Sequence, residues 1–335
     1  MNAEQASLRP VHESYEIGRD TICMILPLLA MSCYFYGPRP AAVCLVAIIT
    51  AIVCDRLVAI LRHTKYDKTE NSSVALSLVL VMMLPASVHY YVVVVSVCVA
   101  VLIGKAAFGG WGAYPFSPPA LGYAVAAVSW PSQVFLFPEP FSMGWEHVLS
   151  TAGLPLVESS THTLKTGGLP NISTFNLILG NYAGPMGATA VLVVLACAAY
   201  LWARRRITLT APVSFLAVCM LIAFVFPRLG DIGLSMPWVH VEARTAMLKY
   251  ELLSGAMLFA SVFLINDPVT LPKNELSRLV YGILLGVATM MFRYFGNYET
   301  GVCFALLAVN SLSGYIDRVV TRLTAHKKGV LRREI

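Results

Sequence analysis

The sequence predicts an all-α integral membrane protein of about ten transmembrane helices, built as two inverted five-helix repeats. Hydrophobic residues make up 57% of the 335 residues and charged residues only 13%, and the mean hydropathy is +0.70. Soluble domains carry about a quarter charged residues, so this chain has too little polar surface for a soluble fold. Its apolar residues gather in runs approaching the roughly 17–25 residues that cross a bilayer. The predicted spans are residues 21–37, 41–61, 72–86, 88–104, 118–130, 185–203, 209–227, 246–266, 279–292 and 301–316.

The distribution of Lys and Arg predicts the orientation of these spans. With the N-terminus inside, the inside segments carry seventeen basic residues and the outside loops carry five. Inside loops of membrane proteins are enriched in Lys and Arg, so both termini are expected in the cytoplasm of a bacterium or archaeon, with the chain in its inner membrane. The net charge of +6 is spread over short runs rather than one basic face. This pattern favours the lipid bilayer as a partner and argues against nucleic acid.

Five segments follow from the span positions. The first of them, residues 1–20, lacks the basic, apolar and small-residue order of a cleavable signal, so the first span is expected to be retained. The segments are a cytoplasmic N-terminal segment (1–20), a first five-helix repeat (21–130), an extracytoplasmic loop (131–184), a second five-helix repeat (185–316) and a basic cytoplasmic tail (317–335).

The repeat is predicted from two matched pairs of segments. Residues 73–85 resemble residues 254–266 in pattern, and Phe108-Gly-Gly-Trp111 after the fourth span resembles Phe295-Gly-Asn-Tyr298 after the ninth. An offset of five spans reverses the orientation, which defines an inverted repeat. In such folds the binding site typically lies at the repeat interface, near interrupted helices.

The cysteines and histidines predict no metal site and no catalytic residue. The eight cysteines contain no Cys-x-x-Cys pair and lie in or beside apolar segments, where buried apolar packing is their expected role. An iron–sulfur or zinc site needs clustered thiolates or histidines. The sequence also lacks a nucleophile elbow and a Walker loop.

Residues 105–119 form the first stretch that interrupts the membrane pattern. Its three glycines and three prolines forbid a continuous helix. Glycine allows a backbone to approach a ligand closely, and the alternative is a tight cytoplasmic turn. The candidate cofactor-binding residues here are Gly109, Gly110, Gly112, Tyr114 and Phe116.

Residues 266–272 form the second stretch, with Asp267 and Thr270 as candidates. Ionisable groups at a membrane boundary are functional candidates by default. A carboxylate is disfavoured at the C-terminus of a helix, so Asp267 is expected to have a specific partner. Capping of a following helix is the alternative role.

The third stretch is the long outside loop, since loops of this length are usually functional or disordered. Its candidates are Ser150 and Thr151, with Asn181, Gly184 and Gly187 in a glycine-rich segment that opens the sixth span. A helix N-terminus in such a segment could receive a phosphate. On the same face, Arg293 is a further candidate, and an exposed ion pair with Glu299 is the alternative for it.

These stretches resemble the D subunits of Rnf electron-transport complexes and the homologous B subunit of the sodium-pumping NADH:quinone reductase. Residues 108–118 are similar to F-G-G-x-G-x-N-P-F-N-P, and Asp267-Pro-Val-Thr270 with Pro272 is similar to D-P-V-T-S-P. Residues 293–305, followed by Asn310 and Asp317-Arg318, are similar to R-x-F-G-G-Y-x-E-G-x-x-F-A, then N and D-R. The similarity covers nearly the whole chain, and the length suits the Rnf subunit.

The resemblance implies a flavin-carrying membrane subunit. It would relay electrons between ferredoxin and NAD, coupled to Na⁺ or H⁺ translocation and assembled with other membrane and peripheral Rnf subunits. In the family, FMN is joined by a phosphoester to the Thr of S-x-A-T, and riboflavin is a further flavin that the resemblance leaves open. Here residues 150–156 read S-T-A-G-L-P-L, so Gly153 stands at the acceptor position. Three alternatives follow: FMN on Thr151, FMN held without a covalent bond, or no flavin.

A channel or small-solute transporter is the competing function, because inverted repeats with broken helices suit transporters as well. The predicted spans contain no paired charges, which argues against a proton-coupled carrier. A structural subunit without flavin is the third interpretation.

Overall fold

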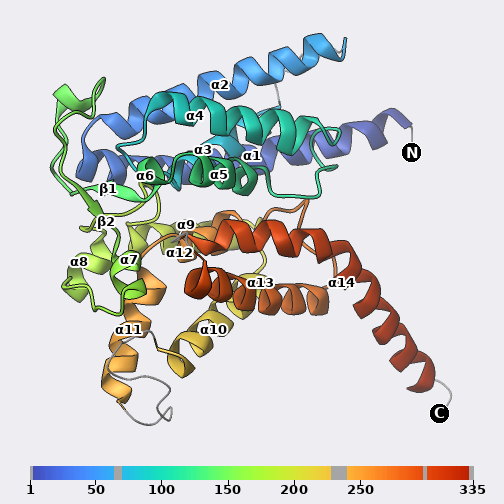
Figure 1. Ribbon diagram of the computed structural model, residues 1–335. Coiled ribbons are helices and arrows are strands. Elements are labelled where there is room, and N and C mark those ends of the chain that lie inside the picture. The colour runs from blue at the N-terminus through green and yellow to red at the C-terminus, as the bar shows by residue number, and fades with distance from the viewer. Residues whose placement is uncertain (1–2, 64–69, 228–239, 297–299, 332–335) are drawn as a thin grey trace.

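The computed structural model describes residues 3–63, 70–227, 240–296 and 300–331. Helices dominate these residues, and the strands found among them form one small antiparallel pair, β1 (Leu136–Pro138) and β2 (Leu156–Glu158). The predicted all-helical membrane fold is therefore confirmed. The helices form two groups, α1–α5 in the upper part of the molecule and α9–α14 in the lower part (Figure 1).

The first group holds the first five predicted spans. Its helix α4 continues directly into a π-helical segment, η1, which ends just before the glycine-rich stretch. The elements are α1 (Ala3–Tyr36), α2 (Arg39–Leu61), α3 (Ser72–Met82), α4 (Tyr90–Cys98), η1 (Val99–Ala106) and α5 (Pro118–Ser129).

The second group holds the other five predicted spans. One prediction is corrected here. The eighth predicted span of the chain, 246–266, is not one helix but two helices that meet at a bend of 46°. The elements are α9 (Val191–Ala203), α10 (Thr210–Val225), α11 (Val241–Leu253), α12 (Met257–Phe263), α13 (Glu275–Phe295) and α14 (Gly301–Leu331).

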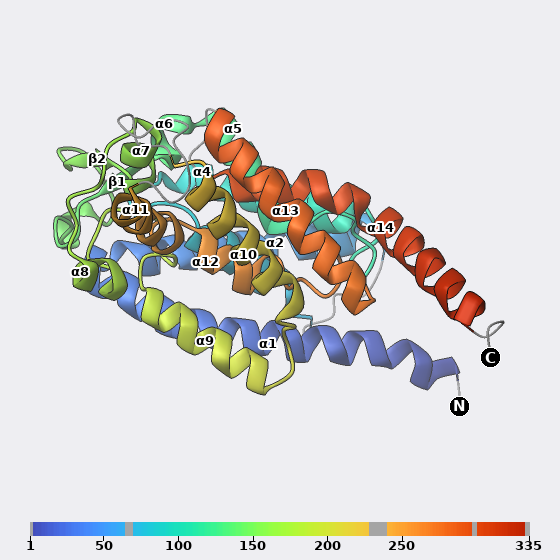
Figure 2. The same cartoon turned by 90° about the horizontal axis from the view of Figure 1, so that it is seen from below.

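Short elements fill the long loop between the groups. They lie at the end of the bundle beside α11, and the first turns of α1 and the last turns of α14 project from the opposite end (Figures 1 and 2). Besides β1 and β2 they are α6 (Pro131–Val134), η2 (Trp145–His147), α7 (Ser160–Lys165) and α8 (Thr174–Leu179).

Helix lengths decide which elements can cross a bilayer alone. In the described part of the chain, four stretches are long and apolar enough: Ser14–Tyr36, Arg39–Leu61, Glu275–Phe295 and Gly301–Thr324. If the bent pair α11–α12 is counted as one span, the number of candidate spans in this part of the chain rises to five. Several other apolar helices are too short to cross a bilayer as single straight helices. Each of the ten predicted spans overlaps a helix or a helix pair. The number ten and the inverted repeat stay predictions.

The two helix groups pack along α5 with α14 and along α1 with α9; Figure 2 shows α9 lying beside α1. Non-helical backbone is buried where they meet. The N–H groups of Met186 and Gly187 donate to the carbonyls of Leu84 (3.1 Å) and Met82 (2.7 Å). These bonds satisfy carbonyls at the end of α3, which a membrane interior would otherwise leave without partners. They also explain why the sixth span is helical only from Val191, and not from residue 185 as predicted.

Candidate functional site

The glycine-rich stretch forms a tight turn between η1 and α5. Gly109, Gly110 and Gly112 have φ angles of +116°, +104° and +86°. A side chain at Gly110 or Gly112 would meet no atom within 4 Å. Backbone conformation rather than crowding therefore requires glycine here, because left-handed φ values are unfavourable for other residues.

The same turn is joined to the residues that follow α12. The Tyr114 hydroxyl donates to Asp267 Oδ1 at 3.1 Å, and the Val269 N–H donates to the same oxygen at 3.2 Å. Tyr114 and Asp267 are both buried. The expectation of a specific partner for Asp267 is confirmed, and two motifs 153 residues apart meet at one place.

Burial controls the charge of Asp267. Removing the carboxyl from water raises its pKa to about 6, although the bonds from Val269 and Tyr114 act in the opposite direction. Asp267 Oδ2 and the Thr270 hydroxyl are buried, and neither forms a hydrogen bond of normal geometry with a described residue. Thr270 still lies close enough to lower the pKa of the carboxyl. Asp267 and Thr270 therefore present one acceptor oxygen and one hydroxyl with which a polar ligand could form hydrogen bonds.

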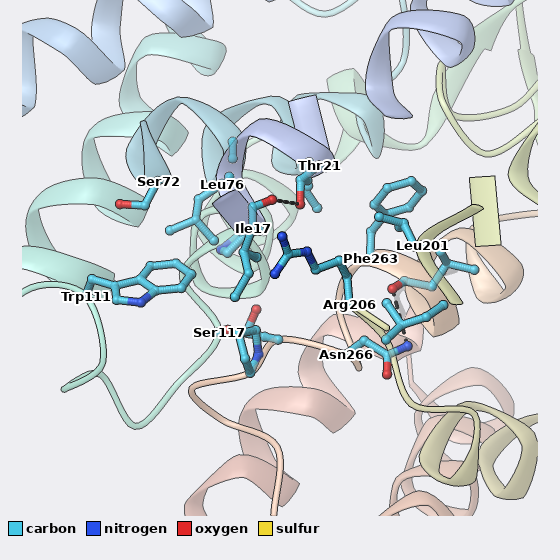
Figure 3. Close-up of a pocket in the computed structure, with 18 residues that line it drawn as sticks. Ile17, Thr21, Ser72, Leu76, Trp111, Ser117, Leu201, Arg206, Phe263 and Asn266 are labelled. Atoms are coloured by element: carbon cyan, nitrogen blue, oxygen red, sulfur yellow. Dashed lines mark hydrogen bonds between the residues drawn. The ribbon is translucent and has the colours of Figure 1, made fainter. Parts of the chain in front are cut away.

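A cavity of about 60 Å³ lies beside this carboxyl. Figure 3 shows Trp111 on one side and Asn266 on the other, with Ile17 of α1, Ser117 and Arg206 between them. Since one water occupies about 30 Å³ in the liquid, the space suits waters or a small ion. A flavin ring would need a wider cavity. The cofactor role of Gly109, Gly110, Gly112, Tyr114 and Phe116 stays a prediction.

At the other end of the bundle, Arg293 of α13 lies opposite Glu251 of α11. Arg293 Nε and Glu251 Oε1 are 3.4 Å apart, and both side chains are buried, with exposed fractions of 4% and 3%. The guanidinium also donates to the Glu251 carbonyl (3.3 Å) and to Thr161 Oγ1 of α7 (3.3 Å). The expected partner Glu299 lies outside the described residues. Glu251 lies in the eighth predicted span and Arg293 lies one residue beyond the ninth, 279–292, so this pair joins two helices at the edge of the predicted spans.

The segment Asn181–Gly187 lies next to this pair. Tyr182 donates to the Leu253 carbonyl at the end of α11 (3.1 Å), and Tyr36 of α1 donates to the Tyr182 carbonyl (3.0 Å). A Cβ atom at Gly187 would lie 2.6 Å from Met82 Cβ. Gly187 is thus required by close packing, and its N–H is already bonded to Met82. A phosphate-binding role for Asn181, Gly184 and Gly187 stays a prediction.

Ser150 and Thr151 lie on the exposed connection between β1 and β2. Ser150 Oγ accepts from the Ala152 N–H (3.3 Å), whereas the Thr151 hydroxyl forms no hydrogen bond with the described residues. Gly153 has a φ of +78° with open space around it. A threonine at position 153 would therefore be strained in this backbone. The cofactor roles of Ser150 and Thr151 stay predictions.

The candidates thus form two linked groups and one separate pair. Tyr114, Asp267 and Thr270 gather with the glycine turn at one end, and Arg293 gathers near Asn181–Gly187 at the other. Within the described contacts, Ser150 and Thr151 belong to neither group.

Sequence reasoning missed several buried polar side chains. Glu251 and Thr161 are not among the residues predicted for the site. Lys105, only 4% exposed, pairs with Glu70 (2.5 Å) and Asp55 (3.9 Å) near the glycine turn. A charged residue inside an apolar run is the signal that could have found Glu251 and Asp55. Across the residues that the structure describes, no three His, Cys, Asp or Glu side chains are grouped to hold a metal ion.

A helical bundle with broken helices and buried charges at both ends defines a polytopic membrane protein with internal polar sites. The chain belongs to the NQR2, RnfD, RnfE family, whose model matches residues 4–325. It is similar to the D subunit of the ion-translocating oxidoreductase complex of Escherichia fergusonii, at 26% identity over 97% of this chain and 99% of that protein. The D subunits of the same complex from Alcanivorax borkumensis and Salmonella paratyphi A are each 28% identical. The match to the Alcanivorax protein covers 89% of this chain and 89% of that protein. The match to the Salmonella protein covers 91% of this chain and 92% of that protein.

Proposed function

We propose that this chain is the D-type membrane subunit of an ion-translocating oxidoreductase complex. In this proposal it relays electrons through a flavin between ferredoxin and NAD, coupled to movement of Na⁺ or H⁺, and assembles with the other subunits of that complex in the inner membrane. The observation that carries the proposal is the family match over residues 4–325, together with relatives of similar length named as such subunits.

For the flavin, we propose FMN joined by a phosphoester to Thr151. A phosphoester needs a hydroxyl, and Thr151 is half-buried on an accessible loop with its hydroxyl not used in a hydrogen bond to the described residues. Gly153 cannot supply one. When bound, FMN accepts two electrons and passes them on singly. Thr151 would hold the phosphate end, while Asp267, with a pKa of about 6, can take up or release a proton at the other end of the bundle.

The covalent bond is tested on the purified chain after denaturation in acid and gel electrophoresis. Ultraviolet light should show a fluorescent band for the unmodified protein and for Ser150→Ala, and a dark band for Thr151→Ala. A dark band for the unmodified protein would remove the covalent flavin. Fluorescence surviving Thr151→Ala would remove Thr151 as its acceptor.

A channel or small-solute transporter is the second candidate function. The observation in its favour is the buried Arg293–Glu251 pair beside the bent pair α11–α12, since such charges mark transport pathways in membrane proteins. The absorption spectrum of the purified native complex separates the two. A flavin band supports the redox subunit, and its absence supports the transporter or a structural subunit.

A further inference from the structure

A second, larger cavity lies beside the one at Asp267 and is lined by positive charge. Its volume is about 220 Å³, and four of its lining side chains are Lys or Arg. It lies between α1, the turn from α9 to α10 and the residues that lead into α13. The lining residues are Ile17, Arg205, Arg206, Thr208, Asn266, Pro268, Leu271, Lys273 and Arg278.

Acidic side chains cancel only part of this charge. Arg206 is paired with Glu16 (2.6 Å) and Asp20 (2.8 Å) of α1. Asp317 of α14 accepts from the backbone N–H of Lys273 (2.9 Å). The Nε of Arg278 donates to the Pro272 carbonyl (2.8 Å).

The side chains of Arg205 and Lys273 form no ion pair with any residue the structure describes. No acidic residue lines the cavity. An excess of positive charge therefore remains.

The backbone at Arg205 supports a role for its side chain. Arg205 has a φ of +56° at the end of α9. Its N–H donates to the Trp202 carbonyl, and the next N–H donates to the Leu201 carbonyl, both at 2.9 Å. This pattern is the helix ending in which glycine is usual. Arginine occupies the position at a conformational cost, and Arg205 is one of the residues that line the cavity.

Neutral polar groups complete the site. Thr208 Oγ1 is buried and has no hydrogen-bond partner among the described residues. Asn266 holds the wall in place, because its Oδ1 accepts from the Thr208 N–H (3.2 Å) and its Nδ2 donates to the Ser261 carbonyl (3.0 Å). A hydroxyl donor beside several cations is the arrangement that phosphate oxygens favour.

The surroundings of the cavity indicate a lipid rather than a free anion. Large apolar side chains on α9, before α10 and on α13, the elements that border the cavity, are exposed, and two of them are of the aromatic kinds that concentrate at membrane interfaces. They are Tyr200, Trp202, Leu209, Leu276 and Leu279, exposed by between 40% and 58%. Basic pockets between transmembrane helices bind anionic lipid headgroups. We infer that this cavity, which we call the basic cavity, binds the phosphate headgroup of an anionic phospholipid, with its acyl chains along α9, α10 and α13.

The experiment compares lipid binding to the full chain by native mass spectrometry in detergent. Phosphatidylglycerol is titrated against phosphatidylcholine for the unmodified protein, for Arg205→Gln with Lys273→Gln, and for Arg318→Gln with Arg322→Gln. The last variant also loses two positive charges from exposed side chains of α14, but neither residue lines the cavity. Arg206 is left intact because it pairs with α1. Thr208→Val removes the hydroxyl without changing charge.

We expect saturable binding of phosphatidylglycerol to the unmodified protein and little binding of phosphatidylcholine. The cavity variant should bind roughly 10- to 30-fold more weakly, as two Lys or Arg contacts to an anionic lipid imply. The α14 variant should bind like the unmodified protein, and Thr208→Val a fewfold more weakly. Equal loss in the two charge variants would overturn the site. Saturable binding of inorganic phosphate by the protein in phosphatidylcholine alone, with no preference for phosphatidylglycerol, would overturn the lipid as the ligand.

Discussion

The two ends of the bundle bury a carboxylate in different ways. At the outer-loop end, Glu251 lies against the guanidinium of Arg293, so the two charges compensate each other. At the opposite end, Asp267 has a tyrosine hydroxyl and a backbone N–H as its partners, and burial raises its pKa to about 6. A paired carboxylate is suited to a fixed structural or binding role. A carboxylate held mainly by neutral donors can change its proton near neutral pH.

The largest expected effect comes from removing the cation of the ion pair. Arg293→Met leaves Glu251 buried without its cation, and removing one partner of a buried ion pair costs about 3–5 kcal/mol. Thermal unfolding of the detergent-purified protein, followed by tryptophan fluorescence, measures the loss. Arg322→Gln on the exposed face of α14 is the control and should leave the midpoint unchanged.

The double variant Arg293→Met with Glu251→Met makes this test more specific. It leaves no charge unpaired, so much of the lost stability should return. If the single and double variants unfold alike, the ion pair is not the source of the loss.

The second effect is a pH dependence that comes from Asp267. Its pKa rises from the ordinary 3.8 to about 6 on folding, a difference that corresponds to about 3 kcal/mol. The folded protein therefore binds the proton more tightly than the unfolded chain. The carboxyl destabilises the fold fully above about pH 6, and this cost disappears as the pH falls toward 3.8.

Asp267→Asn should be the more stable protein at pH 7.5 and should differ little from the unmodified protein at pH 4. Unfolding midpoints of both proteins, measured at several pH values between 4 and 7.5, test this prediction. Tyr114→Phe is the matched variant of opposite sign at neutral pH, because it removes a donor to the carboxylate at a cost of about 1–3 kcal/mol. The same pH slope in Asp267→Asn and the unmodified protein would contradict the assignment.

The smallest effect compares the glycines of the two ends. Gly187→Ala places a Cβ 2.6 Å from that of Met82 in a buried contact, which should cost about 1–3 kcal/mol. Gly110→Ala meets no neighbouring atom but adopts a φ of +104°, so about 1–2 kcal/mol is expected from the backbone alone. The denaturation midpoint of Gly187→Ala should therefore be lower than that of Gly110→Ala. The reverse order would mean that the segment at Gly187 relaxes easily.

Much of the fold was predictable from hydropathy. Each predicted span overlaps a helix or a helix pair because an apolar run long enough to enter a bilayer must satisfy its backbone bonds internally. The break inside the eighth span had a local signal in Ser254-Gly255-Ala256, and Gly255 has a φ of +81°. The late start of α9 had a local signal in Gly184, Pro185 and Gly187, but the bonds from Met186 and Gly187 to residues about a hundred positions earlier could not be read from it.

The site was predictable only in part. The residues that carry the family motifs were found, since glycine, aspartate and proline within apolar surroundings are visible in the sequence. The partner of Arg293 was not: Glu251 lies 42 residues before it and contacts it only because α11 and α13 meet. The basic cavity was missed for the same reason, since Arg205 and Lys273 are 68 residues apart and neither is unusual alone.

Hydropathy and backbone chemistry are local properties of the chain, and for that reason the amino-acid order alone specifies a helical membrane protein that carries the motifs of its family. The packing of the helices specifies which charges are paired, which carboxyl is held by neutral groups and where cations line a cavity. Those outcomes depend on which faces of distant helices meet, and the energy of a buried charge depends on its neighbours rather than on its position in the sequence.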